Sequence, residues 1–312
     1  MTSTPRPFGS YELLRRFAVG ASSEMWLARP RQRRDEGQTV LIKRLLPHLA
    51  DQPEAVELFL QEAKLGAQLQ HPHIIRILEF GEFDRVSYIV REYIEGESLN
   101  AVMSKAKDTG VPISEPLSLY IIARVCEALA YAYHRVDHLE RPQRLLHREI
   151  AARHILLGSD GRVKVMGLGA NNLADLPEPV RAGLTQSRVE NLAPEQLMGQ
   201  EQDQRTDLFG TGLVLYELLT GIRPFKRDST LETIQALFEC QALPPSRVAP
   251  VPPELDALVM KALARAKEDR YPDPHDFQSA LEAYLSSHGS RVGRADVSAV
   301  MQALFPKKTG AS

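Results

Sequence analysis

The spacing of the apolar residues changes once along the chain, near Gly96, and this change restricts the fold more than any other feature. Before it, short apolar runs alternate with polar residues between positions 11 and 93, a pattern typical of β-strands. One run at 54–69 has helical spacing instead. After Gly96 the spacing is helical, apart from a strand pair at 154–167 that turns at Asp160-Gly161.

These patterns predict an α+β fold in two lobes. We expect an N-terminal extension at 1–10, a small lobe with an antiparallel sheet and one helix at 11–94, and a larger, mainly helical lobe at 95–287. A tail at 288–312 carries an amphipathic helical stripe, formed by Val297, Val300, Met301, Leu304 and Phe305. We expect this helix to dock on the helical lobe; the alternative is a free helix that binds a partner.

The composition excludes several classes of function. With 38 basic and 40 acidic residues the net charge is −2, so no positive field favours nucleic acid. No apolar run is long enough for membrane insertion, and the N-terminus lacks a secretory apolar segment. Cys126 and Cys240 lack the spacing of a metal site, which suggests buried thiols. We therefore expect a cytoplasmic protein. The basic run at 29–34 is interpreted as a solvated hairpin loop rather than a polyanion site.

Several short motifs follow one another in a fixed order. These are VLIK ending at Lys43, Glu62 in the first helix, HRE at 147–149, APE at 193–195, Asp207 and Arg270. Their order and spacing resemble the protein kinase family, over about residues 11–287. The local phrasing is most similar to bacterial Hanks-type Ser/Thr kinases, particularly those of myxobacteria. The resemblance implies that Lys43 pairs with phosphates, that Glu62 is its ion-pair partner, and that Arg270 pairs with Glu195.

The catalytic positions depart from the family pattern. Where the family has two metal ligands, an aspartate and an asparagine, this chain has Gly167 and His154. Mg²⁺ prefers hard oxygen ligands, so neither metal site is expected. Glu149 replaces the aspartate that aims the substrate hydroxyl and is longer by one methylene. Ala151 replaces a phosphate-supporting Lys or Ser. We therefore expect these positions to be degenerate.

The nucleotide site that the resemblance implies is altered as well. Ala18 and Ser23 replace two glycines of the glycine-rich loop, so Gly20 alone is a weak cradle. Met25 and the bulky Leu41 are predicted to fill part of the adenine slot. The full set of nucleotide-site positions is Ala18, Gly20, Ser23, Met25, Leu41, Lys43, Glu62, Arg91, Glu92, Ile94 and Leu156. We expect no cofactor, with ATP binding only weakly and without Mg²⁺.

Arg91 occupies the gatekeeper position, just before the hinge residues Glu92 to Ile94. A buried guanidinium needs a partner, and Glu62 is the nearest carboxylate that the resemblance offers. We expect Arg91 to compete with Lys43 for Glu62 and to replace the usual pair. The alternative is that Arg91 reaches solvent and has no special role.

Taken together, these substitutions predict a pseudokinase, not an enzyme, that acts as a protein-binding scaffold or regulator in bacterial signalling. The expected partner is a protein, such as an active kinase or a larger assembly. One alternative is a residual or atypical ATP-dependent Ser/Thr kinase that works through Glu149. Another is a non-catalytic sensor of a nucleotide or small acidic ligand. Thr185 and Ser187 are interpreted as exposed loop hydroxyls rather than phosphorylation sites, and Arg188 and Asn191 predict an eroded peptide groove.

Overall fold

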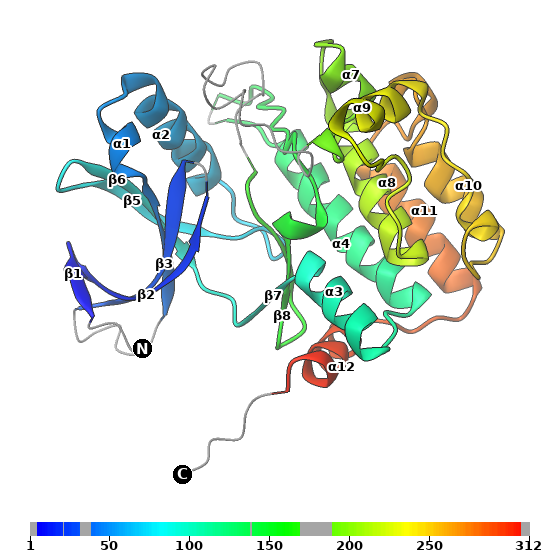
Figure 1. Cartoon of the computed structure of the whole chain (residues 1–312), viewed down its shortest axis with the longest axis horizontal. Helices are drawn as coiled ribbons and strands as arrows, with labels where there is room; N and C mark the ends of the chain where they lie inside the picture. Colours follow the sequence, from blue (N-terminus) through cyan, green and yellow to red (C-terminus); the bar gives the residue numbers. More distant parts are fainter. Residues whose placement is uncertain (1–4, 21, 32–38, 138, 169–188, 307–312) are drawn as a thin grey trace. The chain divides into compact units, whose positions relative to one another are not determined.

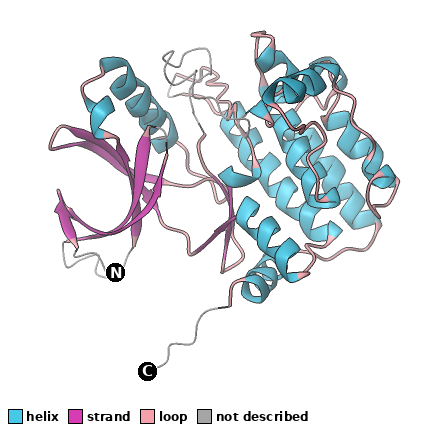
Figure 2. Ribbon diagram, in the orientation of Figure 1, coloured by secondary structure: helices cyan, strands magenta, loops and turns pink. Residues whose placement is uncertain are grey.

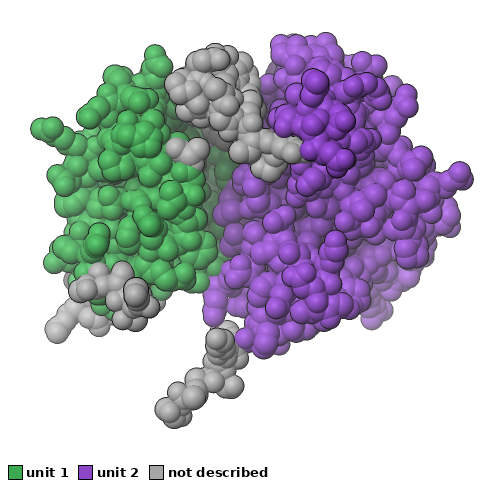
Figure 3. All heavy atoms as spheres, in the orientation of Figure 1, with its two compact units in different colours: residues 1–94, 167–183 green, residues 95–166, 184–312 purple. Residues whose placement is uncertain are grey.

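A computed structural model describes the chain at residues 5–20, 22–31, 39–137, 139–168 and 189–306. The chain divides into two compact units, which Figure 3 colours separately. Unit 1 comprises residues 1–94 and 167–183, and unit 2 comprises residues 95–166 and 184–312. Thr185, Ser187 and Arg188 lie outside the described residues.

Unit 1 is built on an antiparallel sheet (Figure 1). Its six strands lie in the order β1-β2-β3-β4-β6-β5. Its strands are β1 (Arg6–Phe8), β2 (Tyr11–Val19), β3 (Ser23–Pro30), β4 (Val40–Leu45), β5 (Ile77–Phe83) and β6 (Val86–Glu92). Two helices, α1 (Pro47–Ala50) and α2 (Pro53–Ala67), lie between β4 and β5 in the chain. The helix predicted at 54–69 is therefore confirmed.

Each face of this sheet has its own apolar core, because successive side chains of a strand point to opposite faces. One core consists of Phe8, Leu13, Ala28, Val40, Ile42 and Val90. The other joins the sheet to the helices and consists of Leu45, Leu49, Phe59, Ala63 and Ile89. The second core holds α2 against the strands that carry the candidate site residues of unit 1.

Unit 2 is mainly helical (Figure 2). The helices among its described residues are α3 (Leu99–Thr109), α4 (Glu115–His134), α7 (Pro194–Leu197), α8 (Gln204–Thr220), α9 (Thr230–Glu239), α10 (Glu254–Ala262), α11 (Pro274–Ser287) and α12 (Arg294–Leu304). A small sheet in the order β7-β8-β9 is formed by β7 (Gly96–Ser98), β8 (Ile155–Gly158) and β9 (Val163–Val165). Helices α4 and α8 pack on each other and bury most of their residues, so they form the centre of the unit.

The last helix, α12, docks on α3 and β8 through buried Val297, Met301 and Leu304. The Ser298 hydroxyl donates to the Ser159 carbonyl at 2.7 Å. Gly161 has a φ of +83°, and a Cβ there would lie 2.0 Å from the Arg294 carbonyl oxygen. Glycine at this turn therefore permits both the backbone conformation and the approach of α12.

The predicted α+β class with a sheet-rich part followed by a helical part is confirmed. One difference is β1, because residues 6–8 were expected in an extension and instead pair with β2. Among the described residues, no helix is both long and apolar enough to span a lipid bilayer.

Candidate functional site

Unit 1 brings three charged side chains together between α2 and the sheet. Lys43 of β4 lies with its Nζ 2.7 Å from Glu62 Oε2 and 3.0 Å from Oε1. Arg91 of β6 places Nη2 2.5 Å from the same Oε1. Arg91 thus shares Glu62 with Lys43 and does not replace it, so the expected replacement is wrong. The reason is geometric, since a carboxylate with two oxygens accepts several hydrogen bonds at once.

Ionisation of this group reflects burial and the neighbouring charges. Burial alone would raise the pKa of Glu62, but Lys43 and Arg91 overcome this effect and lower it to about 2. Burial lowers the pKa of Lys43; Glu62 opposes that shift, and the charge of Arg91 adds to it. One carboxylate therefore pairs with two cations, which leaves an excess positive charge in a region where all three side chains are largely buried.

The other positions assigned to the nucleotide site lie in both units. In unit 1, the strand register places Met25 opposite Lys43 and Leu41 opposite Arg91, so these side chains share one face of the sheet. Ile94 is buried, Ser23 and Glu92 are half-buried, and Ala18 and Gly20 are exposed at the end of β2. Leu156 belongs to β8 in unit 2 and is half-buried. That Met25 and Leu41 fill an adenine slot stays a prediction.

In unit 2, Asp207 of α8 organises the backbone of the HRE segment. Its two carboxylate oxygens accept the backbone N–H groups of His147 and Arg148, each at 2.7 Å. Burial raises the pKa of Asp207, and His147 and Arg148 oppose this shift. Arg148 adopts a left-handed φ of +64°. Because such a conformation is costly for a residue with a side chain, the contacts of Asp207 must stabilise it.

Two histidines flank Glu149, and each has a defined hydrogen-bonding role. His147 Nε2 lies 2.7 Å from the Met166 carbonyl, and its Nδ1 accepts from the Glu149 N–H at 3.3 Å. His154 Nδ1 lies 2.6 Å from the Glu149 carbonyl. Since a carbonyl can only accept, His147 Nε2 and His154 Nδ1 act as donors. The Glu149 side chain itself forms an ion pair with Arg153. Its carboxylate is therefore held in place by a neighbour that the motifs did not indicate.

The residues at the two implied metal-ligand positions do not fit Mg²⁺. Gly167 has a φ of +86° and offers no side chain, and the Nδ1 of His154 is engaged by a carbonyl. Over the described ranges, no group of three or more His, Cys, Asp and Glu side chains could hold a metal ion. Mg²⁺ requires oxygen ligands in a near-octahedral arrangement.

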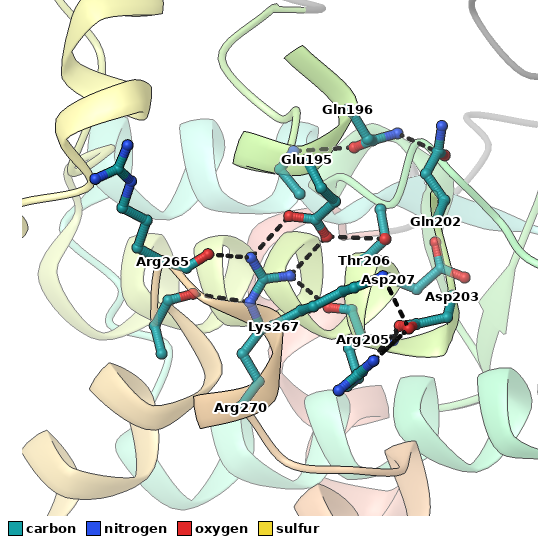
Figure 4. A network of polar contacts seen from close by, with 12 residues as sticks. Glu195, Gln196, Gln202, Asp203, Arg205, Thr206, Asp207, Arg265, Lys267 and Arg270 are labelled. Atoms are coloured by element: carbon teal, nitrogen blue, oxygen red, sulfur yellow. Dashed lines mark hydrogen bonds and ion pairs between the residues drawn. The ribbon is translucent and has the colours of Figure 1, made fainter. Parts of the chain in front are cut away.

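A second buried charge network in unit 2 centres on Glu195 and Arg270 (Figure 4). Arg270 donates to both oxygens of Glu195, at 2.7 and 2.8 Å, and to the carbonyls of Ala264, Arg205 and Arg265. Thr206 donates to the same Glu195 at 2.8 Å. The predicted pairing of Arg270 with Glu195 is confirmed.

Sequence reasoning missed the link between this network and the HRE segment. Gln196 follows Glu195 in α7, and its Nε2 donates to the Arg148 carbonyl at 2.7 Å. Its Oε1 accepts from the Ala193 N–H at 2.9 Å. A glutamine beside the APE motif is a weak signal in sequence, because nothing in its spacing indicates a partner 48 positions away. Asn191, one of the two residues that predicted an eroded peptide groove, is half-buried, and the eroded groove stays a prediction.

Comparison with known proteins decides the family. A family model described as protein tyrosine and serine/threonine kinase matches residues 11–279. The chain belongs to the protein kinase family. It is 35% identical over 301 residues to the tyrosine-protein kinase MasK of Myxococcus xanthus, and 34% identical over 289 residues to the serine/threonine-protein kinase PknB of Mycolicibacterium smegmatis. These alignments cover 96% and 90% of this chain, but only 47% and 44% of the relatives.

Solved structures of kinase domains are similar to most of this chain. The kinase domain of Mycobacterium tuberculosis PknI matches with a TM-score of 0.65 at 25% sequence identity, covering 89% of this chain and 97% of that domain. The kinase fold is therefore established for this chain, and the predicted resemblance to bacterial kinases of the Hanks type is confirmed at the level of the family.

The expected non-enzymatic function is wrong. The relatives are named protein kinases and match 90% or more of this chain, which favours an enzyme over a scaffold. The expectation of no cofactor fails for the same reason, since kinases of this family act on ATP. The expectation rested on four substitutions taken together, at Glu149, Ala151, His154 and Gly167. Groups that act as one catalytic unit have strongly non-additive effects, so substitutions at these positions do not by themselves establish a loss of activity.

Proposed function

We propose that this chain is an atypical protein kinase domain, which transfers the terminal phosphoryl group of ATP to a serine, threonine or tyrosine hydroxyl of a protein. The observation that carries the proposal is the assembled Lys43–Glu62 ion pair, with Nζ 2.7 Å from Oε2. In protein kinases this pair directs the lysine that binds the phosphates of ATP. Relatives named as tyrosine kinases and as serine/threonine kinases both support a protein hydroxyl as the acceptor.

The chain's own residues supply three roles in this proposal. The Lys43 ammonium binds the phosphates of ATP, and Glu62 orients it. Glu149 accepts the hydroxyl proton of the substrate while the substrate oxygen bonds to the terminal phosphorus and the bond to the leaving ADP oxygen breaks. The ion pair with Arg153 restrains the Glu149 carboxylate. Asp207 fixes the backbone that precedes Glu149, because its carboxylate accepts the N–H groups of His147 and Arg148.

The proposed reaction is slow, because Gly167 and His154 remove two oxygen ligands that the family uses for Mg²⁺. Exchanging both residues, Gly167→Asp with His154→Asn, should raise the rate by about 100-fold or more, since metal ions contribute several kcal/mol to such reactions. Protein substrates are the partners that this proposal implies. Use of ATP also supports a cytoplasmic location for the domain.

The decisive experiment measures transfer of radiolabelled phosphate from ATP, with divalent cations present, to the protein itself and to a general protein acceptor. Lys43→Met and Glu149→Gln should each lower the rate by about 100-fold. The matched controls are Lys64→Met on the exposed side of α2 and Glu97→Gln on β7, which should leave the rate unchanged. Incorporation that is the same in the wild type, Lys43→Met and Glu149→Gln would refute the proposal. Analysis of the phosphorylated residues identifies which hydroxyl is used.

A further inference from the structure

The most unusual side chain of unit 1 is Arg91, a buried arginine that points at a helix carboxylate already paired with a lysine. Its Nη2 lies 2.5 Å from Glu62 Oε1, and Lys43 Nζ lies 3.0 Å from the same oxygen. The side chains of Arg91, Glu62 and Lys43 are 11%, 15% and 17% exposed. One oxygen therefore accepts from two cations in a region largely closed to water.

The strand register explains why both cations reach α2. Strands β4 and β6 are antiparallel, with Leu41 opposite Arg91 and Lys43 opposite Ile89. Directly opposite residues share a face, as do residues two apart in one strand, so Lys43 and Arg91 lie on the same face. Ile89 of that face packs with Phe59 and Ala63 of α2. Glu62, adjacent to Ala63, is thus bound from two neighbouring strands at once.

This arrangement is not the one that stability alone would favour. Two cations against one carboxylate leave an excess positive charge in a poorly hydrated region, and such a charge disfavours folding. The Arg91 Nε is buried and makes no hydrogen bond within the described part of the chain. An apolar side chain at position 91 would avoid both costs. Arg91 therefore has to be explained by what it does to its two neighbours.

We propose that Arg91 is a positioning residue of the phosphotransfer reaction: it holds α2 to the sheet through Glu62 and so keeps the Lys43–Glu62 pair assembled before any ligand binds. The reaction itself rests on the function proposed above. In protein kinases the position of the corresponding helix is a control point, because the lysine–glutamate pair must be in place for transfer. Here β6 holds the helix as well as β4, so loss of the Lys43 contact alone does not release it.

Arg91 also changes the pKa of the Lys43 ammonium. The groups that face its ammonium are Glu62 and the Phe59 ring of α2, whose centroid is 5.3 Å from Nζ, together with Arg91 of β6. Burial lowers the pKa of Lys43, and the charge of Arg91 lowers it further. Removing Arg91 should therefore raise the pH at which the Lys43 amine reacts with an electrophile. A residue that only filled space would not have this effect.

The first test is amide hydrogen exchange over α2 in the full chain, recorded without ATP. Arg91→Met should speed exchange of the α2 amides by about 10-fold, and Arg91→Lys, which keeps a cation, should restore most of the protection. Lys43→Met should leave α2 protected within about 3-fold, because Arg91 still binds Glu62. Combining Lys43→Met with Arg91→Met should release the helix by more than the product of the single effects.

Arg44→Met is the matched control. Arg44 is the next residue of β4, lies on the opposite face with its guanidinium 4.5 Å from the Phe8 ring centroid, and contacts Glu24. This variant should leave exchange in α2 unchanged. If Arg91→Met leaves α2 fully protected while Lys43→Met releases it, Lys43 alone positions the helix and the inference is wrong.

The second test follows labelling of Lys43 by an amine-reactive probe across a pH series, read by mass spectrometry. The midpoint should move to higher pH in Arg91→Met and stay in place in Arg44→Met; an unmoved midpoint in Arg91→Met would contradict the role of Arg91. Neither readout requires phosphotransfer, so an inactive wild type would count against the proposed function and not against this inference. In an active protein, Arg91→Met should lower the rate and Arg91→Lys should recover it.

Discussion

Each unit buries a glutamate, and the two glutamates differ in the number of cations that they pair with. Glu195 in unit 2 has one cationic partner, Arg270, whose guanidinium N–H groups all find acceptors. Glu62 in unit 1 has two cationic partners, and one nitrogen of Arg91 finds no acceptor among the described residues. The first network is balanced and suited to holding a fold together. The second carries excess charge, as expected where a protein prepares a site for an anion such as a phosphate group.

The largest expected difference between the networks appears when their arginines are removed. Arg270→Met should lower the free energy of unfolding of unit 2 by about 3 to 5 kcal/mol, because it leaves Glu195 buried without its counter-ion. Arg91→Met should lower the stability of unit 1 by only about 1 kcal/mol, because Lys43 still neutralises the charge of Glu62. Urea unfolding separates the two, since the single tryptophan, Trp26, lies in β3 of unit 1 and far-UV circular dichroism reports mainly the helices of unit 2. Equal losses of unfolding free energy in Arg270→Met and Arg91→Met would show that the two charge networks do not differ in this way.

The second prediction concerns acid. The pKa of Glu62 in the folded protein is about 2, below its usual 4.5. The unfolded state therefore binds the proton first, so the stability from this group is fully present above about pH 5 and is lost as the pH falls towards 2. The loss amounts to about 3 kcal/mol.

The measurement is the stability difference between the wild type and Glu62→Gln, followed by Trp26 fluorescence from about pH 6 to about pH 2.5. This difference should shrink as the pH falls. Subtracting the variant removes the contribution of Asp207, whose raised pKa acts in the opposite direction, with stability lost as pH rises from its usual 3.8 towards the raised value. A difference that does not depend on pH would show that Glu62 is not held as an anion by its two cations.

An effect smaller than the losses expected for Arg270→Met and for acid is expected from a single hydrogen bond in the balanced network. Thr206→Val removes the hydroxyl that donates to Glu195 at 2.8 Å but leaves Arg270 in place. Unit 2 should lose about 2 kcal/mol, the range for a hydrogen bond to a charged group. Thr211→Val removes a hydrogen bond to the uncharged backbone carbonyl of Asp207. This variant should lower the stability by about 1 kcal/mol in the same circular dichroism assay. If Thr206→Val destabilises as much as Arg270→Met, the network depends on its full set of contacts rather than on the ion pair.

Much of the fold was predictable because it follows from the spacing of apolar residues along the chain. The 54–69 pattern corresponds to α2 at Pro53–Ala67, and the turn at Asp160-Gly161 joins β8 to β9. Strand β1 was not predictable, since three residues that include a proline carry almost no periodic signal and form a strand only by pairing with β2. The pairing of Arg270 with Glu195 was predictable only through the family resemblance.

The residues of the candidate site were predictable from the sequence, but their contacts and the activity they support were not. Whether Arg91 replaces Lys43 or joins it at Glu62 depends on side-chain rotamers and on strand register, which no motif specifies. The ion pair between Arg153 and Glu149 likewise follows from a local turn, η2 (Ala152–His154), that brings residues four apart together. The inference from single substitutions to loss of activity failed because catalytic contributions are shared among groups.

The docking of α12 changes where the helical unit ends. Ser159 donates its N–H to the carbonyl of Glu95, the first residue of unit 2, and its own carbonyl accepts from Ser298 in the last helix. One residue of the β8–β9 turn therefore links the first residue of unit 2 to α12 through hydrogen bonds of its N–H and its carbonyl. The buried contacts of unit 2 thus extend past residue 279, where the family match stops, and past α11. A protein cut between α11 and α12 would expose the apolar surface of α3 and β8 to water and invite aggregation, even though every kinase motif would still be present.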